Sequence, residues 1–170
     1  YYGFYPMAEE LVIQAAVEAG GTVFDAAPHR AKLPPIYNRY YPVTHDPCRE
    51  DDLRALLQPL LATGYLLADW LYDNDWFGAE QIIVGSASSK TAIGLCTYLQ
   101  EYEDRPFRII GLTSAGNAAF VEKAGTCDTV VGYDDIEKLA VVASVYVDMA
   151  GNADVKRRLL PANVRFRTQS

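Results

Sequence analysis

The sequence predicts an α/β protein with a Rossmann-like parallel sheet covered by helices on both faces, preceded by a β-rich remnant of a barrel-like domain. Two patterns indicate this architecture. From residue 80 onward, short apolar runs alternate with helix-like stretches of about 10 to 15 residues, as in βαβ units. Before residue 46, tyrosines, prolines and short apolar runs predominate, as in barrel or meander strands. We therefore divide the chain into a β-rich segment at 1–46 and a partial Rossmann-like domain at 47–170.

The first segment contains short apolar runs that we interpret as strands. These runs are Leu11–Ile13, Thr22–Phe24 and Ile36–Tyr37, and Gly and Pro pairs lie between them. Residues 8–19 also fit a helix, so both alternatives stay open there.

Residues 50–73 change to helical spacing, with leucines recurring every three or four positions. Pro59 lies inside this stripe and lacks the amide hydrogen that a helix needs. We therefore predict two helical pieces. Further along, we expect strands at 81–84, 107–112, 129–131 and 141–148, and helices at 92–102, 114–124 and 152–160.

Composition excludes several classes of protein. Half of the 170 residues are hydrophobic and the net charge is −7, which is the wrong sign for a protein that wraps nucleic acid. The basic side chains near the end of the chain are interpreted as a solvated helix end: Lys156, Arg157, Arg158, Arg165 and Arg167.

No apolar run is long enough to cross a membrane, and no export signal precedes the first strand, so we expect a cytoplasmic protein. Both ends look cut, so the chain is expected to be a fragment of a longer polypeptide.

Metal and thiol chemistry are not expected. Three cysteines and two histidines, His29 and His45, lack the spacing of a zinc site or of a disulfide scaffold. We expect the thiols of Cys48, Cys96 and Cys127 to be reduced and passive, with Cys96 facing inward from its helix.

The first candidate site is the polar turn that follows the strand at 81–84. Ligands of open parallel sheets bind beyond the carboxyl ends of the strands, where the amides of the next helix are exposed. The hydroxyls, the lysine and these amides favour an anion such as phosphate, and they belong to Ser86, Ser88, Ser89, Lys90 and Thr91. The alternative is that Ser86 or Ser88 only caps the helix.

Two phosphate-binding motifs fit this turn incompletely. A Walker loop needs glycines where Val84 and Ser89 stand. The dinucleotide fingerprint needs three glycines, of which Gly85 is present while Ala87 and Lys90 take the other two positions. The βαβ context keeps the dinucleotide hypothesis open.

The second turn bears on which cofactor would bind. An NAD site usually carries an acid after its second strand, whereas residues 111–117 contain none. The neutral side chains of Thr113, Ser114 and Asn117 tolerate a 2′-phosphate better than a carboxylate would, which favours NADP. As alternatives, Thr113 or Ser114 caps the next helix.

The run from Ile82 to Leu160 resembles the cofactor domain of the medium-chain dehydrogenase/reductase superfamily, especially its zinc-free quinone-oxidoreductase branch. The matching pieces, in order, are Ile83–Ser88, Ile110–Ser114, Phe120–Gly125, Asp128–Tyr133 and Val145–Gly151. Three further pieces are similar to an uncharacterised family of domain-of-unknown-function proteins related to that superfamily: Tyr1–Met7, Ile36–Asn38 and Ser86–Ala92. Such relatives are about twice as long as this chain and carry a barrel-like substrate domain before the cofactor domain.

This resemblance implies a role for each matching residue. Ser86, Ala87, Ser88 and Ser89 would bind the pyrophosphate. Ser114 would hold the 2′-phosphate, with Asn117 where the branch has a lysine. Tyr133 would pack near the adenosine phosphate, and Ala150 and Gly151 would lie near the nicotinamide ribose.

Tyr37 and Asn38 are candidate catalytic residues, since they can donate a hydrogen bond to a developing oxyanion on the substrate. Packing and a turn are the alternative roles.

The leading hypothesis is an NADP(H)-dependent, zinc-independent oxidoreductase that acts on a small carbonyl, enone or quinone-like substrate. It requires free amides in the turn after Val84. A non-catalytic Rossmann-like binding or scaffold module is the alternative, and a P-loop phosphotransferase is a third possibility. The sequence leaves a homodimer open.

Overall fold

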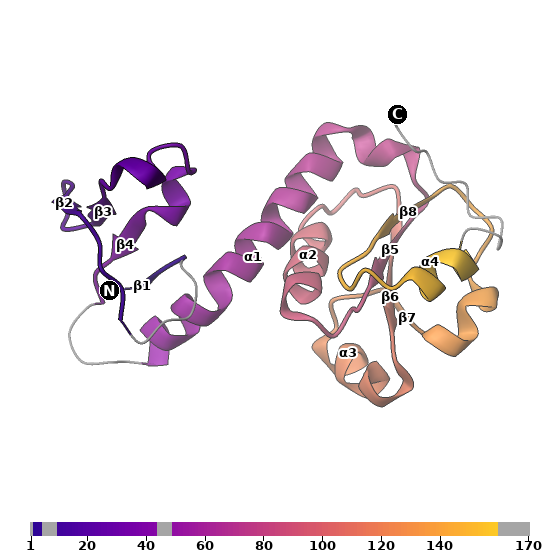
Figure 1. The fold of residues 1–170 in the computed structure, drawn as a ribbon. Coiled ribbons are helices and arrows are strands. Elements are labelled where there is room, and N and C mark those ends of the chain that lie inside the picture. The colour runs from indigo at the N-terminus through magenta and orange to yellow at the C-terminus, as the bar shows by residue number, and fades with distance from the viewer. Residues whose placement is uncertain (1, 5–9, 44–48, 160–170) are drawn as a thin grey trace. The chain divides into compact units, whose positions relative to one another are not determined.

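A computed structural model describes residues 2–4, 10–43 and 49–159 (Figure 1). The chain divides into two compact units, Tyr1–Pro59 and Leu60–Ser170, each of which is described by itself. The boundary that we expected near residue 46 lies outside the described residues. In the described part of the chain, no helix is both long and apolar enough to cross a membrane.

The first unit contains a small antiparallel sheet with the strand order β1-β4-β3-β2. Its strands are β1 (Tyr2–Gly3), β2 (Ala15–Val17), β3 (Val23–Asp25) and β4 (Arg39–Tyr41). The β-rich character is therefore confirmed, whereas its origin in a barrel-like domain stays a prediction. Two expected strands are wrong: Leu11–Ile13 is irregular, and Ile36–Tyr37 lies in a 3-10 turn that begins at Pro35. Proline favours such a turn because its ring fixes φ and it lacks a ladder donor.

Helix α1 (Arg49–Asp73) is continuous through Pro59, so the prediction of two helical pieces is wrong. Proline removes a single amide hydrogen, and Ala55, whose carbonyl loses its partner, is exposed to water. Part of the predicted apolar stripe is exposed too, with Leu56 at 56% and Trp70 at 54%. Leu71, at the end of that stripe, is buried as expected, and so is Ala68, which the stripe did not include.

The second unit is built on a parallel sheet with the strand order β7-β6-β5-β8 (Figure 1). The strands are β5 (Gln81–Gly85), β6 (Arg108–Thr113), β7 (Thr129–Gly132) and β8 (Ser144–Val147). In the register, Ile83 of β5 lies opposite Ile110 of β6 on one side and Tyr146 of β8 on the other. The predicted α/β fold with a parallel sheet is confirmed, and β8 is shorter than expected.

Helices connect and follow these strands. They are α2 (Lys90–Gln100), α3 (Ala118–Ala124) and α4 (Ala153–Leu159). The expected helix at 114–124 begins with a 3-10 turn at Ala115–Asn117, so only its second part is α-helical. Gly125 ends α3 in the left-handed conformation that glycine adopts at low cost.

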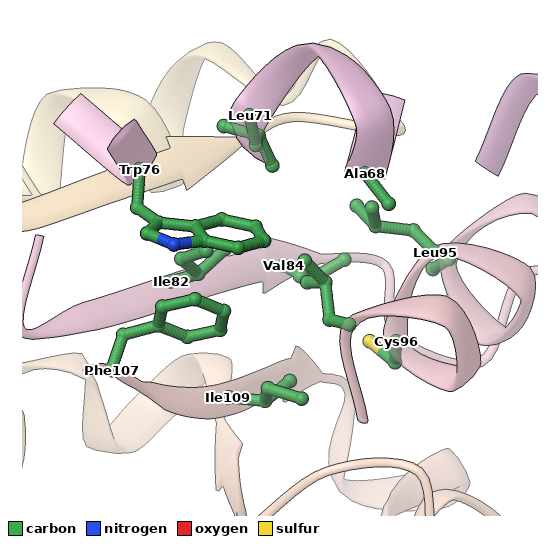
Figure 2. Close-up of a cluster of buried hydrophobic side chains, with 11 residues drawn as sticks. Ala68, Leu71, Trp76, Ile82, Val84, Leu95, Cys96, Phe107 and Ile109 are labelled. Carbon is green, nitrogen blue, oxygen red and sulfur yellow. The ribbon is translucent and has the colours of Figure 1, made fainter. Parts of the chain in front are cut away.

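Two hydrophobic clusters cover the sheet. The larger one joins α1 and α2 to the sheet through Leu71, Leu95, Ile82 and Ile109, as Figure 2 shows. The other joins Ile83, Ile110 and Leu112 to residues of α4 and of the 3-10 segment Tyr133–Lys138. Alternate side chains of β5 belong to the two clusters because successive side chains of a strand point to opposite faces.

Helices α1 and α2 cross at glycines. A Cβ atom on Gly64 would lie 2.6 Å from the backbone nitrogen of Leu95, and one on Gly94 would lie 2.9 Å from a side-chain carbon of Leu61. At Gly64 the neighbour is backbone, which leaves no room for a side chain, whereas at Gly94 it is a side-chain carbon, so Gly64 sets how closely α1 and α2 approach.

Candidate functional site

The candidate site lies at the carboxyl edge of the parallel sheet. The chain passes from β5 through β6 to β7 on one side of β5, and returns to its other side with β8. The strand order therefore reverses between β5 and β8, which is where open α/β sheets leave a crevice for ligands. The turn at 86–89 and the segment after β8 border this point.

Ser86 opens the turn in a left-handed backbone conformation, with φ of +52°. This conformation is uncommon for a residue with a side chain. Two hydrogen bonds hold the turn in place. The Ser86 amide donates to the Tyr133 hydroxyl at 3.1 Å, and the Ala87 amide donates to the Leu112 carbonyl oxygen at 3.0 Å.

Ser89 is the cap of α2. Its hydroxyl oxygen accepts a hydrogen bond from the Ala92 amide at 3.2 Å, and its own amide donates to the Ser86 carbonyl oxygen at 2.8 Å. The sequence had suggested Ser86 or Ser88 for this role. The cap stands one residue later than Ser88 because α2 begins only at Lys90.

The dinucleotide hypothesis requires unbonded amides, and only some amides in and after this turn are unbonded. The amides of Ser86, Ala87, Ser89 and Ala92 are occupied by protein acceptors. Those of Ser88, Lys90 and Thr91 make no hydrogen bond to any residue of the described ranges. Lys90 is exposed beside them. Three amides and one ammonium group are therefore available to an anion at the start of α2.

The second turn lies beside the first. The Asn117 side-chain amide donates to the Ser88 hydroxyl at 3.1 Å. Ser114 is exposed, whereas Thr113 is almost fully buried, with 1% exposure. The structure thus brings Ser88, Ser114 and Asn117 to neighbouring turns, and it places the Thr113 side chain in the protein interior.

Tyr133 connects the third turn to the first. It follows β7, and its hydroxyl lies 3.1 Å from the Ser86 nitrogen and 3.4 Å from the Ser86 hydroxyl oxygen. The structure thus brings Tyr133 to the turn on which the expected pyrophosphate site depends.

Strand β8 places Tyr146, which sequence reasoning missed, next to β5. A Cβ atom on Gly85 would lie 2.7 Å from the Tyr146 hydroxyl, so this hydroxyl rests on Gly85. Burial and the neighbouring Asp148 carboxylate raise the pKa of Tyr146, which keeps the phenol protonated. The alternation of Tyr146 and Asp148 at the end of a strand is the signal that could have identified them.

Ala150 and Gly151 form a tight turn after β8. Their amides donate to one carboxylate oxygen of Asp148, at 3.1 Å and 2.8 Å respectively. These amides are occupied, so the turn would contact a ligand through its other atoms.

Tyr37 and Asn38 belong to the first unit. The Tyr37 side chain is 46% exposed, whereas that of Asn38 is 1% exposed. Asn38 accepts a hydrogen bond from Arg30 Nε at 3.0 Å and donates one to the Arg30 carbonyl oxygen at 3.0 Å. Arg30 in turn pairs with the buried Asp25 at 3.3 Å. Asn38 is therefore part of a polar network that organises this unit.

The described ranges contain no group of three or more side chains that could hold a metal ion. In α4, Arg157 pairs with Asp154 and Arg158 with Glu137. His29 is exposed, and His45, Cys48, Arg165 and Arg167 lie outside the described residues.

A family model described as a protein of unknown function (DUF2855) matches residues 1–168. The chain matches no curated protein.

Proposed function

The chain belongs to the DUF2855 family of proteins of unknown function, and we propose that it binds NADP(H) at the carboxyl edge of its parallel sheet. The proposed activity is that of a zinc-independent oxidoreductase acting on a small carbonyl, enone or quinone-like compound. The resemblance to the zinc-free branch of the medium-chain reductases supports the class of reaction.

The observation that carries this proposal is the set of three unbonded amides at the start of α2. The amides of Ser88, Lys90 and Thr91 and the exposed side chain of Lys90 belong to consecutive residues next to the point where the strand order reverses. Backbone donors at a helix start favour a diphosphate through the partial positive charge of the helix end. This donor set fits the pyrophosphate of a dinucleotide.

The second turn favours NADP over NAD. Residues 113–117 contain no carboxylate that would repel a 2′-phosphate. Ser114 and Asn117 are exposed and offer a hydroxyl and an amide to it. Lys90 would supply the only positive charge among the residues assigned to the cofactor. We therefore expect NADPH to bind more tightly than NADH.

The protein would position the reactants around the cofactor. A bound nicotinamide would supply the hydride chemistry, while the chain supplies orientation and electrostatics.

The second candidate is a non-catalytic binding or scaffold module. One observation favours it: three amides of the turn and that of Ala92 in α2 are already bonded to protein atoms, and Ala87 is fully buried where the fingerprint has glycine. Such a turn leaves less room for a pyrophosphate than a glycine-rich one.

Isothermal titration of the protein with NADPH and with NADH separates the two candidates. We expect NADPH to bind, NADH to bind more weakly, and Lys90→Ala to weaken NADPH binding by about tenfold, since it removes a charge from the phosphates. Lys123→Ala is the matched control, because Lys123 is an exposed lysine on α3 and should leave the affinity unchanged. Absence of heat with either nucleotide at millimolar concentration would eliminate the enzyme proposal and favour the module.

A further inference from the structure

Two cysteines that are far apart in the sequence meet beneath the turn at 86–89. Cys96 lies on α2, and Cys127 precedes β7. Their sulfur atoms are 3.7 Å apart and share a hydrogen bond, and both thiols are free. This separation is van der Waals contact between sulfurs, whereas a disulfide needs about 2.05 Å. The two sulfurs would have to approach by roughly 1.7 Å to form the bond.

The two thiols differ in access to solvent. Cys96 has 0% exposure and packs in the cluster of Figure 2, close to Val84 and Leu95. Cys127 is only half-buried, so it is the more accessible residue of the two. Thr126 also lies beside it, with its hydroxyl 3.9 Å from the Cys127 sulfur.

The pair also differs in acidity. The neighbouring Cys96 thiol lowers the pKa of Cys127, because it can donate a hydrogen bond to the Cys127 thiolate. The same contact, together with burial, raises the pKa of Cys96. The thiolate is the nucleophilic form of cysteine, so Cys127 is the attacking sulfur and Cys96 the resolving one.

We propose that Cys96 and Cys127 form a reversible disulfide when the protein meets a hydroperoxide. The Cys127 thiolate attacks the terminal peroxide oxygen, the O–O bond breaks, and a sulfenic acid forms together with an alkoxide, or with hydroxide when the oxidant is hydrogen peroxide. The Cys96 thiol then attacks the Cys127 sulfur, the S–OH bond breaks, and water leaves with the thiol proton. Two thiols thus give up two electrons to the peroxide, and a dithiol reductant reverses the change.

The position of the pair gives this reaction a structural consequence. A Cβ atom on Gly111 would lie 2.7 Å from the Cys127 sulfur and 3.2 Å from the Cβ of Ala87. The sulfur and Ala87 therefore pack against the same point of β6. Movement of the Cys127 sulfur toward Cys96 opens space next to the Ala87 turn. The disulfide itself does not depend on the function proposed above.

Peptide mapping of the folded protein tests the proposal. The protein is oxidised with one equivalent of hydrogen peroxide, remaining thiols are alkylated, and the digest is analysed by mass spectrometry without reduction. We expect a Cys96–Cys127 crosslink in several-fold excess over either pairing with Cys48, and its loss after dithiothreitol. The Cys48→Ser protein keeps the pair and should give the same crosslink.

The same oxidation of the guanidinium-denatured chain is the reference for random pairing. If the folded protein yields the crosslink in no greater proportion than the denatured chain, or yields none while peroxide is consumed, the proposal is wrong. A dimedone adduct on Cys127 in the Cys96→Ala protein would independently support Cys127 as the attacking sulfur. An adduct on Cys48 alone would count against it.

Discussion

Ser86 adopts a left-handed backbone conformation that is usually found at glycine. Its φ of +52° is a conformation that glycine reaches without cost, and a residue with a side chain pays about 1 kcal/mol or more to adopt it. The Tyr133 hydroxyl holds the Ser86 amide in this conformation. The hydroxyl is therefore expected to stabilise the turn.

Tyr133→Phe tests this contact. It removes the acceptor of the Ser86 amide and keeps the ring, so we expect a loss of about 1 kcal/mol in the free energy of unfolding. Urea unfolding followed by tryptophan fluorescence is a suitable measurement, because both tryptophans of the chain, Trp70 and Trp76, belong to the second unit.

Tyr65→Phe is the control for this experiment. Tyr65 is 50% exposed and contacts the Tyr98 ring, and loss of its hydroxyl should change the stability little. If the two variants unfold at the same urea concentration, the Tyr133 hydroxyl does not support the turn.

At the scale of elements, the crossing of α1 and α2 depends on having no side chain at Gly64. A Cβ at this position would meet backbone atoms, namely the Leu95 nitrogen at 2.6 Å and the Gly94 carbonyl carbon at 2.9 Å. Backbone cannot rotate away as a side chain can, so one helix must move.

Gly64→Ala is therefore expected to destabilise the second unit by about 1 to 3 kcal/mol, despite the high helix propensity of alanine. Thermal unfolding followed by tryptophan fluorescence measures the effect. Gly116→Ala is the matched change, because a Cβ there meets nothing within 4 Å. Equal melting temperatures for the two variants would contradict the close crossing.

At the scale of the whole second unit, Asp128 ties together three segments at the edge opposite the candidate site. Its carboxylate accepts hydrogen bonds from both terminal nitrogens of Arg105, at 2.8 Å and 2.7 Å, and from the Ile109 amide at 2.7 Å. The Arg105 guanidinium lowers the pKa of Asp128 below its usual range.

This shift makes the stability of the unit depend on pH. Because the folded state holds Asp128 ionised, its contribution is present above the unfolded pKa of about 4 and is lost as the pH falls through the lower folded value. We expect Asp128→Asn to cost about 1 kcal/mol at neutral pH, a value kept small because the pair is partly exposed. The difference from the wild type should shrink in urea titrations below pH of about 4. A difference that stays constant with pH would contradict this role.

Much of the second unit could be predicted from the sequence, because buried parallel strands leave unbroken apolar runs such as Ile82–Val84. The first unit was harder, since its three-residue strands contain too few side chains to show a period. Pro59 misled the prediction of α1, because the loss of one amide hydrogen does not stop a helix whose remaining bonds are intact.

The position of a ligand site at the carboxyl edge of the sheet stays a prediction, and the sequence did not show how the turns there are arranged. The contact of the Tyr146 hydroxyl with Gly85 is a property of the assembled sheet, so the spacing within β8 alone could not place Tyr146 against β5. The contact between Cys96 and Cys127 likewise arises only when α2 and the segment before β7 meet.

The available donors at the start of α2 are peptide groups, and this has an evolutionary consequence. A backbone amide is kept in almost any substitution, so the serines of this segment can be replaced while the amides that could bind an anion remain in place. Relatives of this chain can therefore share one binding behaviour without sharing a signature in this segment. Relatives with the same site are therefore better identified by comparing structures than by searching for a sequence motif.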